Sequence, residues 1–184
     1  LAALLLPAPP ATAADDGWVS LFDGKTLTGW KASESPASFR VADGAIACDG
    51  PRAHLFYVGG DGKASFENFE AEAEVRARAG ANSLARDDEW FTLRVTVRKP
   101  RVEVRVNGAL VVDWIEPPGP LPEGAPKMNR LSRGTFALQC HDPESKVFYR
   151  NLRVKPLPVP AAVAAPMPPV DARYAQMLAL GRAN

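Results

Sequence analysis

The sequence predicts an all-β protein, an antiparallel β-sandwich built from many short strands. Three observations support this prediction. Apolar and polar residues alternate with a period of two along several stretches, which is the pattern of half-buried strands. Gly, Pro, Asn and Asp residues separate these stretches at short intervals. The sequence shows no alternation of strand and helix patterns of the kind that builds a parallel sheet.

The clearest strand pattern covers residues 68–78. Phe, Ala and Val fall on one face of this stretch, while Glu and Arg fall on the other. A helix is the alternative, because Ala and Glu are good helix formers. A helix would spread these charges around its whole circumference, so the alternation favours a strand.

A three-strand meander follows. Residues 90–98 and 101–106 repeat the alternation, and Asn107-Gly108 supplies the two positive-φ positions of a tight hairpin turn before residues 109–114. Residues 135–141 and 146–155 are two further strands joined by a turn-rich segment. Shorter strands are predicted at 19–22, 39–41, 45–47 and 54–58.

Composition limits the classes of function. The chain of 184 residues has room for one domain of ordinary size, and 46% hydrophobic residues allow a packed core. The 22 Lys and Arg residues nearly balance the 21 Asp and Glu residues, and opposite charges alternate along the chain. We therefore expect no nucleic-acid partner and no basic membrane-binding face.

The two ends differ from the middle. Residues 1–14 read as the apolar core and cleavage site of a secretory signal peptide, with a disordered Ala/Pro tail as the alternative. We expect a secreted or periplasmic protein whose folded domain covers residues 15–157. Residues 158–170 form a predicted Pro-rich, extended linker. Residues 171–184 carry a helical pattern, which suggests the start of a second domain in the same polypeptide.

Cys48 and Cys140 each take a core-facing position of a predicted strand. Cys48 shares its parity with Ile46, and Cys140 shares its parity with Leu138. The two residues either pair as a disulfide or pack as buried thiols, and the sequence leaves both alternatives open. Two Cys and two His make no recognisable zinc site, so we predict no metal and no cofactor.

Three blocks of the chain resemble the 3-keto-disaccharide hydrolase family. The blocks are LFDGKTLTGW at residues 21–30, the segment 68–83, and the segment 133–157, which contains GTFALQCHD and YRNLRVKPL. They occur in the family's order. The resemblance implies a concanavalin-like jelly roll with a carbohydrate ligand on a concave sheet. It breaks after Ser83, where the family has a block of inner strands that this sequence lacks.

The resemblance also implies a reaction. A ketone at C3 of a sugar acidifies the proton at C2, so a base can remove that proton and the glycosidic bond at C1 then breaks by elimination. Water adds back, and the net result is hydrolysis of a 3-keto-glycoside. A non-catalytic carbohydrate-binding module, an inactive fragment of the enzyme and a structural spacer remain alternative functions, because a fold does not determine a function.

His141 is the predicted general base, because an imidazole titrates near neutral pH. Gln139 lies on the same strand face as His141, and Asp142 follows directly and could orient the imidazole. A solvated strand end is the structural alternative for this group. The candidate substrate-binding residues, which include donors for the enolate oxygen, are Asn82, Ser83, Arg52 and His54.

Glu70, Glu72 and Glu74 have two interpretations. They form a solvated strand face, or they act as paired carboxylates that bind a cation or transfer protons. The four tryptophans could stack on a sugar ring, with core packing as the expected role of each.

Overall fold

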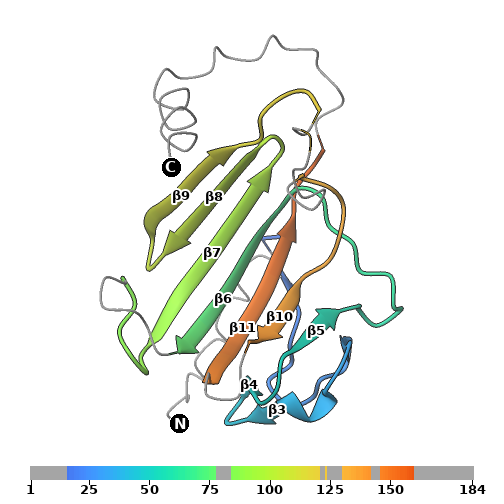
Figure 1. Cartoon of the computed structure of the whole chain (residues 1–184), viewed down its shortest axis with the longest axis vertical. Helices are drawn as coiled ribbons and strands as arrows, with labels where there is room; N and C mark the ends of the chain where they lie inside the picture. The colour runs from blue at the N-terminus through green and yellow to red at the C-terminus, as the bar shows by residue number, and fades with distance from the viewer. Residues whose placement is uncertain (1–15, 78–83, 121–122, 124–129, 142–145, 160–184) are drawn as a thin grey trace, which may run out of the picture.

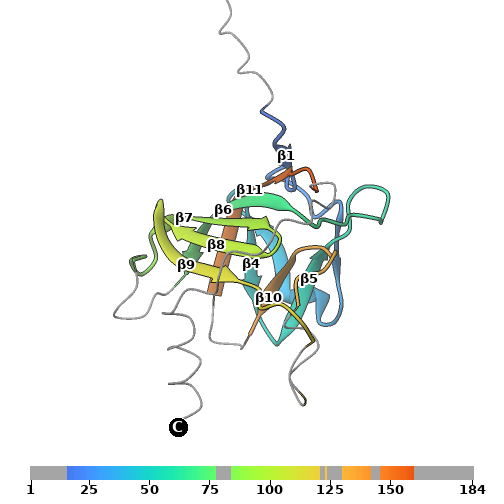
Figure 2. The ribbon, with the colours of Figure 1, turned by 90° about the horizontal axis from the view of Figure 1, so that it is seen from above.

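The computed structural model describes residues 16–77, 84–120, 123, 130–141 and 146–159. Within these residues the chain forms two antiparallel sheets, one of eight strands and one of three. The small sheet lies beside the β4 and β11 side of the large sheet, away from β8 and β9 (Figures 1 and 2). The predicted fold class, an all-β sandwich, is confirmed.

The large sheet has the strand order β3-β4-β11-β6-β7-β8-β9, and β1 pairs with β11. Every pair of neighbouring strands in it is antiparallel. Its strands are β1 (Val19–Ser20), β3 (Phe39–Ala42), β4 (Ala45–Asp49), β6 (Phe69–Ala77), β7 (Trp90–Arg98), β8 (Arg101–Val106), β9 (Ala109–Ile115) and β11 (Lys146–Pro156).

The small sheet has the order β10-β5-β2, and its strands are β2 (Trp30–Ala32), β5 (Ala53–Tyr57) and β10 (Ala137–Cys140). Of the strands in both sheets, β2 is the one that the sequence pattern did not predict. It has only three residues, too few for an alternation to be recognised. The other strands begin and end within two residues of the predicted positions.

The meander β7–β8–β9 turns as predicted. Asn107 and Gly108 have φ angles of 49° and 82°, the left-handed values that a tight hairpin turn needs. Asn107 Oδ1 also accepts a hydrogen bond of 3.0 Å from the backbone N–H of Thr92. This bond ties the β8–β9 turn to β7 and explains why a polar side chain with αL tolerance suits this position.

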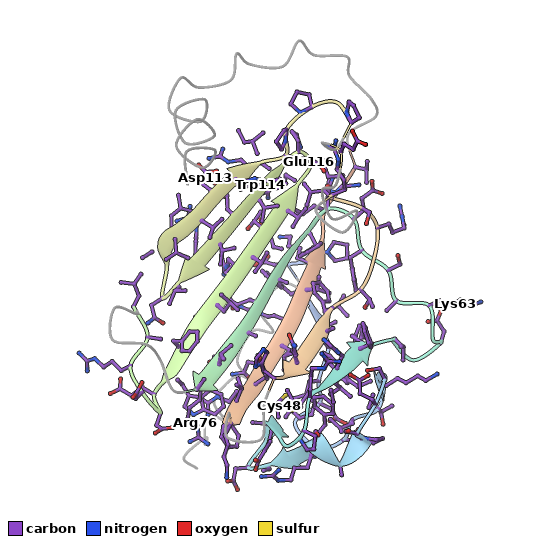
Figure 3. All side chains as sticks on the ribbon, in the orientation of Figure 1. Cys48, Lys63, Arg76, Asp113, Trp114 and Glu116 are labelled. Atoms are coloured by element: carbon purple, nitrogen blue, oxygen red, sulfur yellow. The ribbon has the colours of Figure 1, made fainter. Side chains whose placement is uncertain are left out.

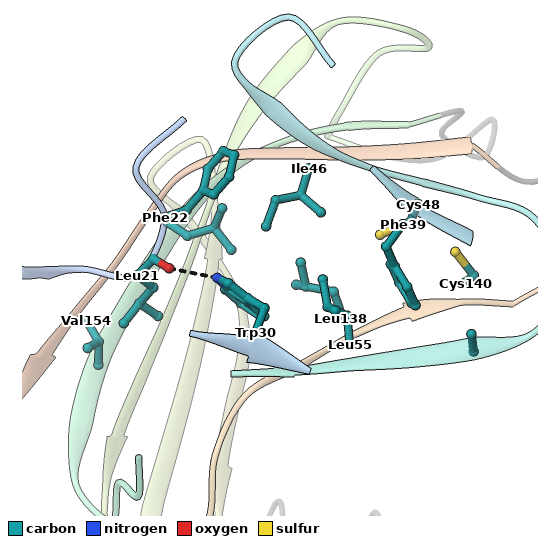
Figure 4. Packing of buried hydrophobic residues seen from close by; sticks show 12 residues of the cluster. Leu21, Phe22, Trp30, Phe39, Ile46, Cys48, Leu55, Leu138, Cys140 and Val154 are labelled. Atoms are coloured by element: carbon teal, nitrogen blue, oxygen red, sulfur yellow. Dashed lines mark hydrogen bonds between the residues drawn. The ribbon is translucent and has the colours of Figure 1, made fainter. Parts of the chain in front are cut away.

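The core lies between the small sheet and the part of the large sheet formed by β3, β4 and β11 (Figure 4). Trp30 of β2 is buried there and donates a hydrogen bond of 2.8 Å from its indole Nε1 to the backbone oxygen of Leu21. The other buried members of this cluster are Leu21, Phe22, Phe39, Ile46, Cys48, Ala53, Leu55, Leu138, Cys140, Leu152 and Val154.

The small sheet is too narrow to cover the whole large sheet. The inner faces of β7, β8 and β9 are apolar, but most of their side chains are only half-buried. Val112 is 43% exposed. Trp114, two positions further along the same strand, is half-buried (Figure 3). This open face is what the sequence predicts for a sandwich that lacks a block of inner strands after Ser83.

The predicted signal peptide, the helix at 171–184 and all but the first two residues of the linker lie outside the described residues. Cys48 and Cys140 lie inside them, and both are buried free thiols in the structure.

Candidate functional site

Pairing of β5 with β10 brings predicted site residues together. Gln139 of β10 and His54 of β5 are direct cross-strand partners. Leu55 and Leu138, one position along each strand, are buried in the core. Because side chains alternate between the two faces of a strand, His54 and Gln139 point away from the core on the outer face of the small sheet.

His141 and Arg52 lie at one end of the same strand pair. His141 is the residue directly after β10, and Arg52 is the residue directly before β5. The last registered pair of these two strands is Cys140 with Ala53. Both His141 and Arg52 are exposed. The predicted site residues of these two strands are 85 or more positions apart in the sequence, and they are gathered on one surface because β5 and β10 are neighbours.

Glu34 belongs to the same surface, although the sequence did not identify it. Pairing of β2 with β5 continues to Ser33, whose backbone N–H donates a hydrogen bond of 2.9 Å to the carbonyl oxygen of His54. The next residue, Glu34, places its Oε1 3.3 Å from Nδ1 of His54. The side chains of His54 and Glu34 are 36% and 46% exposed, so solvent reaches both.

The carboxylate of Glu34 is held in its charged form. The hydrogen bond from the Ser33 hydroxyl lowers the pKa of Glu34 most, and His54 and Arg52 lower it further against an opposing effect of burial. An ionised carboxylate only accepts hydrogen bonds, so Nδ1 of His54 carries the proton in this contact. A neutral His54 then presents Nε2 as a proton acceptor, which is the state that a general base requires.

Phe56 adds an apolar patch next to these polar groups. Its ring centroid lies 6.0 Å from that of His54, and the residue is 37% exposed. Lys31 of β2 is its cross-strand partner. An aromatic face beside hydrogen-bonding side chains is a common arrangement for holding a sugar ring.

The structure does not test every predicted site residue. Asn82, Ser83 and Asp142 lie outside the described residues. The described members are Gln139, His141, His54 and Arg52, and the structure places all four at the β5–β10 pair.

The outer face of the large sheet is a second polar surface, and its carboxylates are engaged in ion pairs. Glu72 accepts hydrogen bonds from both Arg94 and Arg153, and Glu74 pairs with Arg150 at 2.5 Å. Glu70 similarly pairs with Arg98 at 2.7 Å. Because arginines pair with all three carboxylates, these half-buried glutamates fit a structural strand face better than an acid/base role.

Arginine guanidinium groups lie over the rings of two tryptophans on this outer face. Arg153 lies 4.6 Å from the ring centroid of Trp18, and Arg150 lies 4.0 Å from that of Trp90. Two shallow hollows of about 440 and 460 Å³ flank Glu72. Because cations already occupy these ring faces, the tryptophans are poor platforms for a sugar.

The described part of the chain contains no cluster of three or more His, Cys, Asp or Glu side chains arranged to hold a metal ion. Within those same residues, no helix has the length and apolar character needed to cross a membrane.

The match to a protein-family model shows which family the chain belongs to. The model of the 3-keto-alpha-glucoside-1,2-lyase-like domain matches residues 17–85 and 81–155. The chain belongs to this family. The two matched segments overlap at residues 81–85, which is where the sequence departs from the family pattern after Ser83. The predicted resemblance is confirmed over nearly all of the described residues.

A curated relative agrees with membership of the family. The chain is 33% identical over 75 residues to a 3-keto-disaccharide hydrolase from Bacteroides thetaiotaomicron. The aligned segment covers 37% of this chain and 26% of the relative, so the chain spans only about a quarter of that protein.

Solved structures show the same fold. A crystal structure described as a putative glycosyl hydrolase from Parabacteroides distasonis has a TM-score of 0.58 at 17% identity, covering 77% of this chain and 94% of that one. The carbohydrate-binding module CBM66 from Bacillus subtilis has a TM-score of 0.51 at 11% identity, covering 70% of this chain and 96% of the module. At these identities the likeness concerns the sandwich architecture.

Proposed function

We propose that this domain binds a 3-keto-glycoside on the outer face of the small sheet and cleaves its glycosidic bond by proton abstraction next to the ketone. The observation that supports the proposal most is the contact of His54 with Glu34 directly beside Gln139. Membership of a family named for 1,2-lyase chemistry and the name of the curated relative support the class of substrate.

In the proposed reaction, Nε2 of His54 removes the proton from C2 of the sugar. The electron pair of the broken C–H bond forms the C2–C3 double bond of an enolate, and the negative charge moves to the ketone oxygen. Expulsion of the leaving group from C1 then gives an unsaturated ketone, to which water adds at C1. The proton held by the imidazole goes to the departing oxygen, and the added water gives its hydroxyl group to C1 and a proton to C2. The net change is hydrolysis.

Three polar groups surround the proposed base. Gln139 lies directly across from His54 and carries an amide N–H₂ that can donate to the enolate oxygen. Arg52 lies close enough to Glu34 to lower its pKa, and its guanidinium adds positive charge to the surface where the enolate would form. Glu34 holds the Nδ1 proton and stabilises the imidazolium after proton transfer.

His141 remains the second candidate for the base. It lies at the end of the same strand pair, and its predicted partner Asp142 is outside the described residues. We favour His54 because Glu34 Oε1 lies 3.3 Å from its Nδ1 and Gln139 is its direct cross-strand partner.

Matched substitutions separate the two histidines. His54→Ala is expected to lower turnover of a chromogenic 3-keto-glucoside by roughly a hundredfold or more, since general-base catalysis contributes about that much. Glu34→Gln should lower it less, and His141→Ala should change it least. Melting temperatures of the three variants control for folding. If His141→Ala abolishes turnover while His54→Ala retains it, His141 is the base and the assignment to His54 is wrong.

A non-catalytic carbohydrate-binding module is the second candidate function. Similarity to the fold of CBM66 and the three-strand width of the small sheet, which leaves a limited surface for a substrate, favour it. Titration with a 3-keto-glucoside and with the unoxidised glucoside distinguishes the two functions. Binding of either sugar without release of the leaving group would support the module, while an absence of both binding and turnover would leave an inactive fragment of the enzyme.

A further inference from the structure

Cys48 and Cys140 lie on opposite sheets of the sandwich and meet in its core. Cys48 is in β4 of the large sheet, and Cys140 is the last residue of β10 in the small sheet. Cys48 is 1% exposed and Cys140 is 2% exposed. Both side chains lie between the two layers, near Phe39 (Figure 4). Besides burial, the neighbouring Cys140 helps to raise the pKa of the Cys48 thiol.

The strands that carry the two cysteines lie close to each other. Cα atoms of β4 and β10 approach within 8 Å of each other, which is less than the usual separation of about 10 Å between stacked sheets. Cys140 Sγ also donates a hydrogen bond of 3.4 Å to the backbone oxygen of Ser38. Ser38 directly precedes Phe39, which is the cross-strand partner of Cys48.

Gly50 shows how tightly this corner is packed. It follows β4 with a φ of +154°, and a Cβ atom placed on it would lie 2.7 Å from Oγ of Ser38. Glycine therefore allows the chain after Cys48 to approach the residue that Cys140 contacts. The two cysteines are held in a corner whose backbone segments are already in contact.

We propose that oxidation during folding closes a disulfide between Cys48 and Cys140 that joins the two sheets of the sandwich. Neither residue is required by the proposed reaction, and both are buried. The bridge would close a loop of about 90 residues, and long loops gain the most stability from cross-linking because the unfolded chain loses more freedom.

The bridge forms by two thiol–disulfide exchanges with a low-molecular-weight disulfide such as oxidised glutathione. One cysteine thiolate attacks a glutathione sulfur, which gives a mixed disulfide and releases one reduced glutathione. The second cysteine thiolate then attacks the cysteine sulfur of the mixed disulfide. The Cys48–Cys140 bond forms, a second reduced glutathione leaves, and the two thiol protons pass to the released thiolates.

Burial determines when this exchange takes place. Burial raises the pKa of the Cys48 thiol, with a further contribution from Cys140, and burial also raises the pKa of the Cys140 thiol. Thiolate is therefore scarce in the folded protein, and both sulfurs are shielded from large reagents. We expect the bridge to form before the core closes and to resist reduction afterwards.

The test is to refold the full chain from denaturant with either reduced or oxidised glutathione, and to measure intact mass after alkylation under denaturing conditions. The expected product with oxidised glutathione is a monomer that takes up no alkylating agent and has lost two hydrogen atoms. Its melting temperature should exceed that of the reduced protein by roughly 10 °C. The double variant Cys48→Ala, Cys140→Ala should melt at the same temperature under both conditions.

Three results would overturn the proposal. The first is that both thiols are still alkylated after oxidative refolding. The second is that the cysteines end as glutathione adducts or as disulfides between chains. The third is an oxidised protein with the intramolecular bridge that melts no higher than the reduced protein. All three are read from the wild-type chain, so the test does not depend on a variant that folds.

Discussion

Two parts of the same large sheet differ sharply in burial. Strand β4 faces the small sheet, and its residues Ile46 and Cys48 are 0% and 1% exposed. Strand β9, at the other edge, has no second layer over its inner face among the residues that the structure describes, and Val112 is 43% exposed. Both regions carry strand-forming, apolar residues. The difference therefore comes from the width of the opposing sheet, which ends at β10.

This comparison indicates that strands β7–β9 are held in place mainly by backbone hydrogen bonds between strands and by side-chain interactions on the outer face of the sheet. The guanidinium group of Arg101 in β8 donates two hydrogen bonds of 2.7 Å to the carboxylate of Asp113 in β9. Figure 3 labels Asp113. On the other side of β7, Arg94 bonds to Glu72 of β6. Stability in this region comes from hydrogen bonds and ion pairs, whereas the β4 region depends on burial of apolar area.

The largest expected effect is at the centre of the covered region. Ile46→Ala should lower the free energy of unfolding by about 2–5 kcal/mol, because it leaves a cavity where the wild-type side chain is fully buried. Urea denaturation followed by tryptophan fluorescence measures the change. A loss below about 1 kcal/mol would show that this half is packed as loosely as the β9 edge.

The same chemical change in both regions sharpens the contrast. Val154→Thr places a hydroxyl at a position that is 1% exposed, and it should cost about 1–3 kcal/mol. Val112→Thr introduces the hydroxyl where water already reaches, and it should change stability by less than about 0.5 kcal/mol. Equal losses in the two variants would mean that another part of the protein or a partner covers the inner face of β9 in solution.

The smallest effect is expected on the outer face of the large sheet. Burial alone would raise the pKa of Glu72, but hydrogen bonds from Arg153 and Arg94 outweigh it and lower the pKa below 4.5. A carboxylate with a lowered pKa in the folded state stabilises the protein above its unfolded pKa. That contribution is lost as the pH falls below about 4.5 and through the folded pKa.

Glu72→Gln tests this contribution. The variant should lose about 1 kcal/mol at pH 7, a modest value because Arg94 and Arg153 are partly exposed to solvent. The difference from wild type should shrink when both proteins are unfolded in urea at pH 3. A difference that stays constant between the two pH values would mean that side-chain packing, not the ion pairs, is lost in the variant.

The local structure of this protein follows from its sequence. Alternation with a period of two depends only on the geometry of a strand, so β6, β7 and β8 were predicted within one residue of their ends. The same parity correctly separates Gln139, which is exposed, from Leu138 and Cys140, which are buried. The turn at Asn107 and Gly108 was predictable because so few residues adopt positive φ angles easily.

Only the tertiary structure determined which distant residues meet. His54 and Gln139 are partners because β5 and β10 are neighbours, and Glu34 reaches His54 because the three-residue strand β2 lies on the other side of β5. Neither sequence spacing nor residue type encodes such contacts. They depend on how strands far apart in the chain are ordered in a sheet, and the burial of each face depends on whether a second layer lies opposite it.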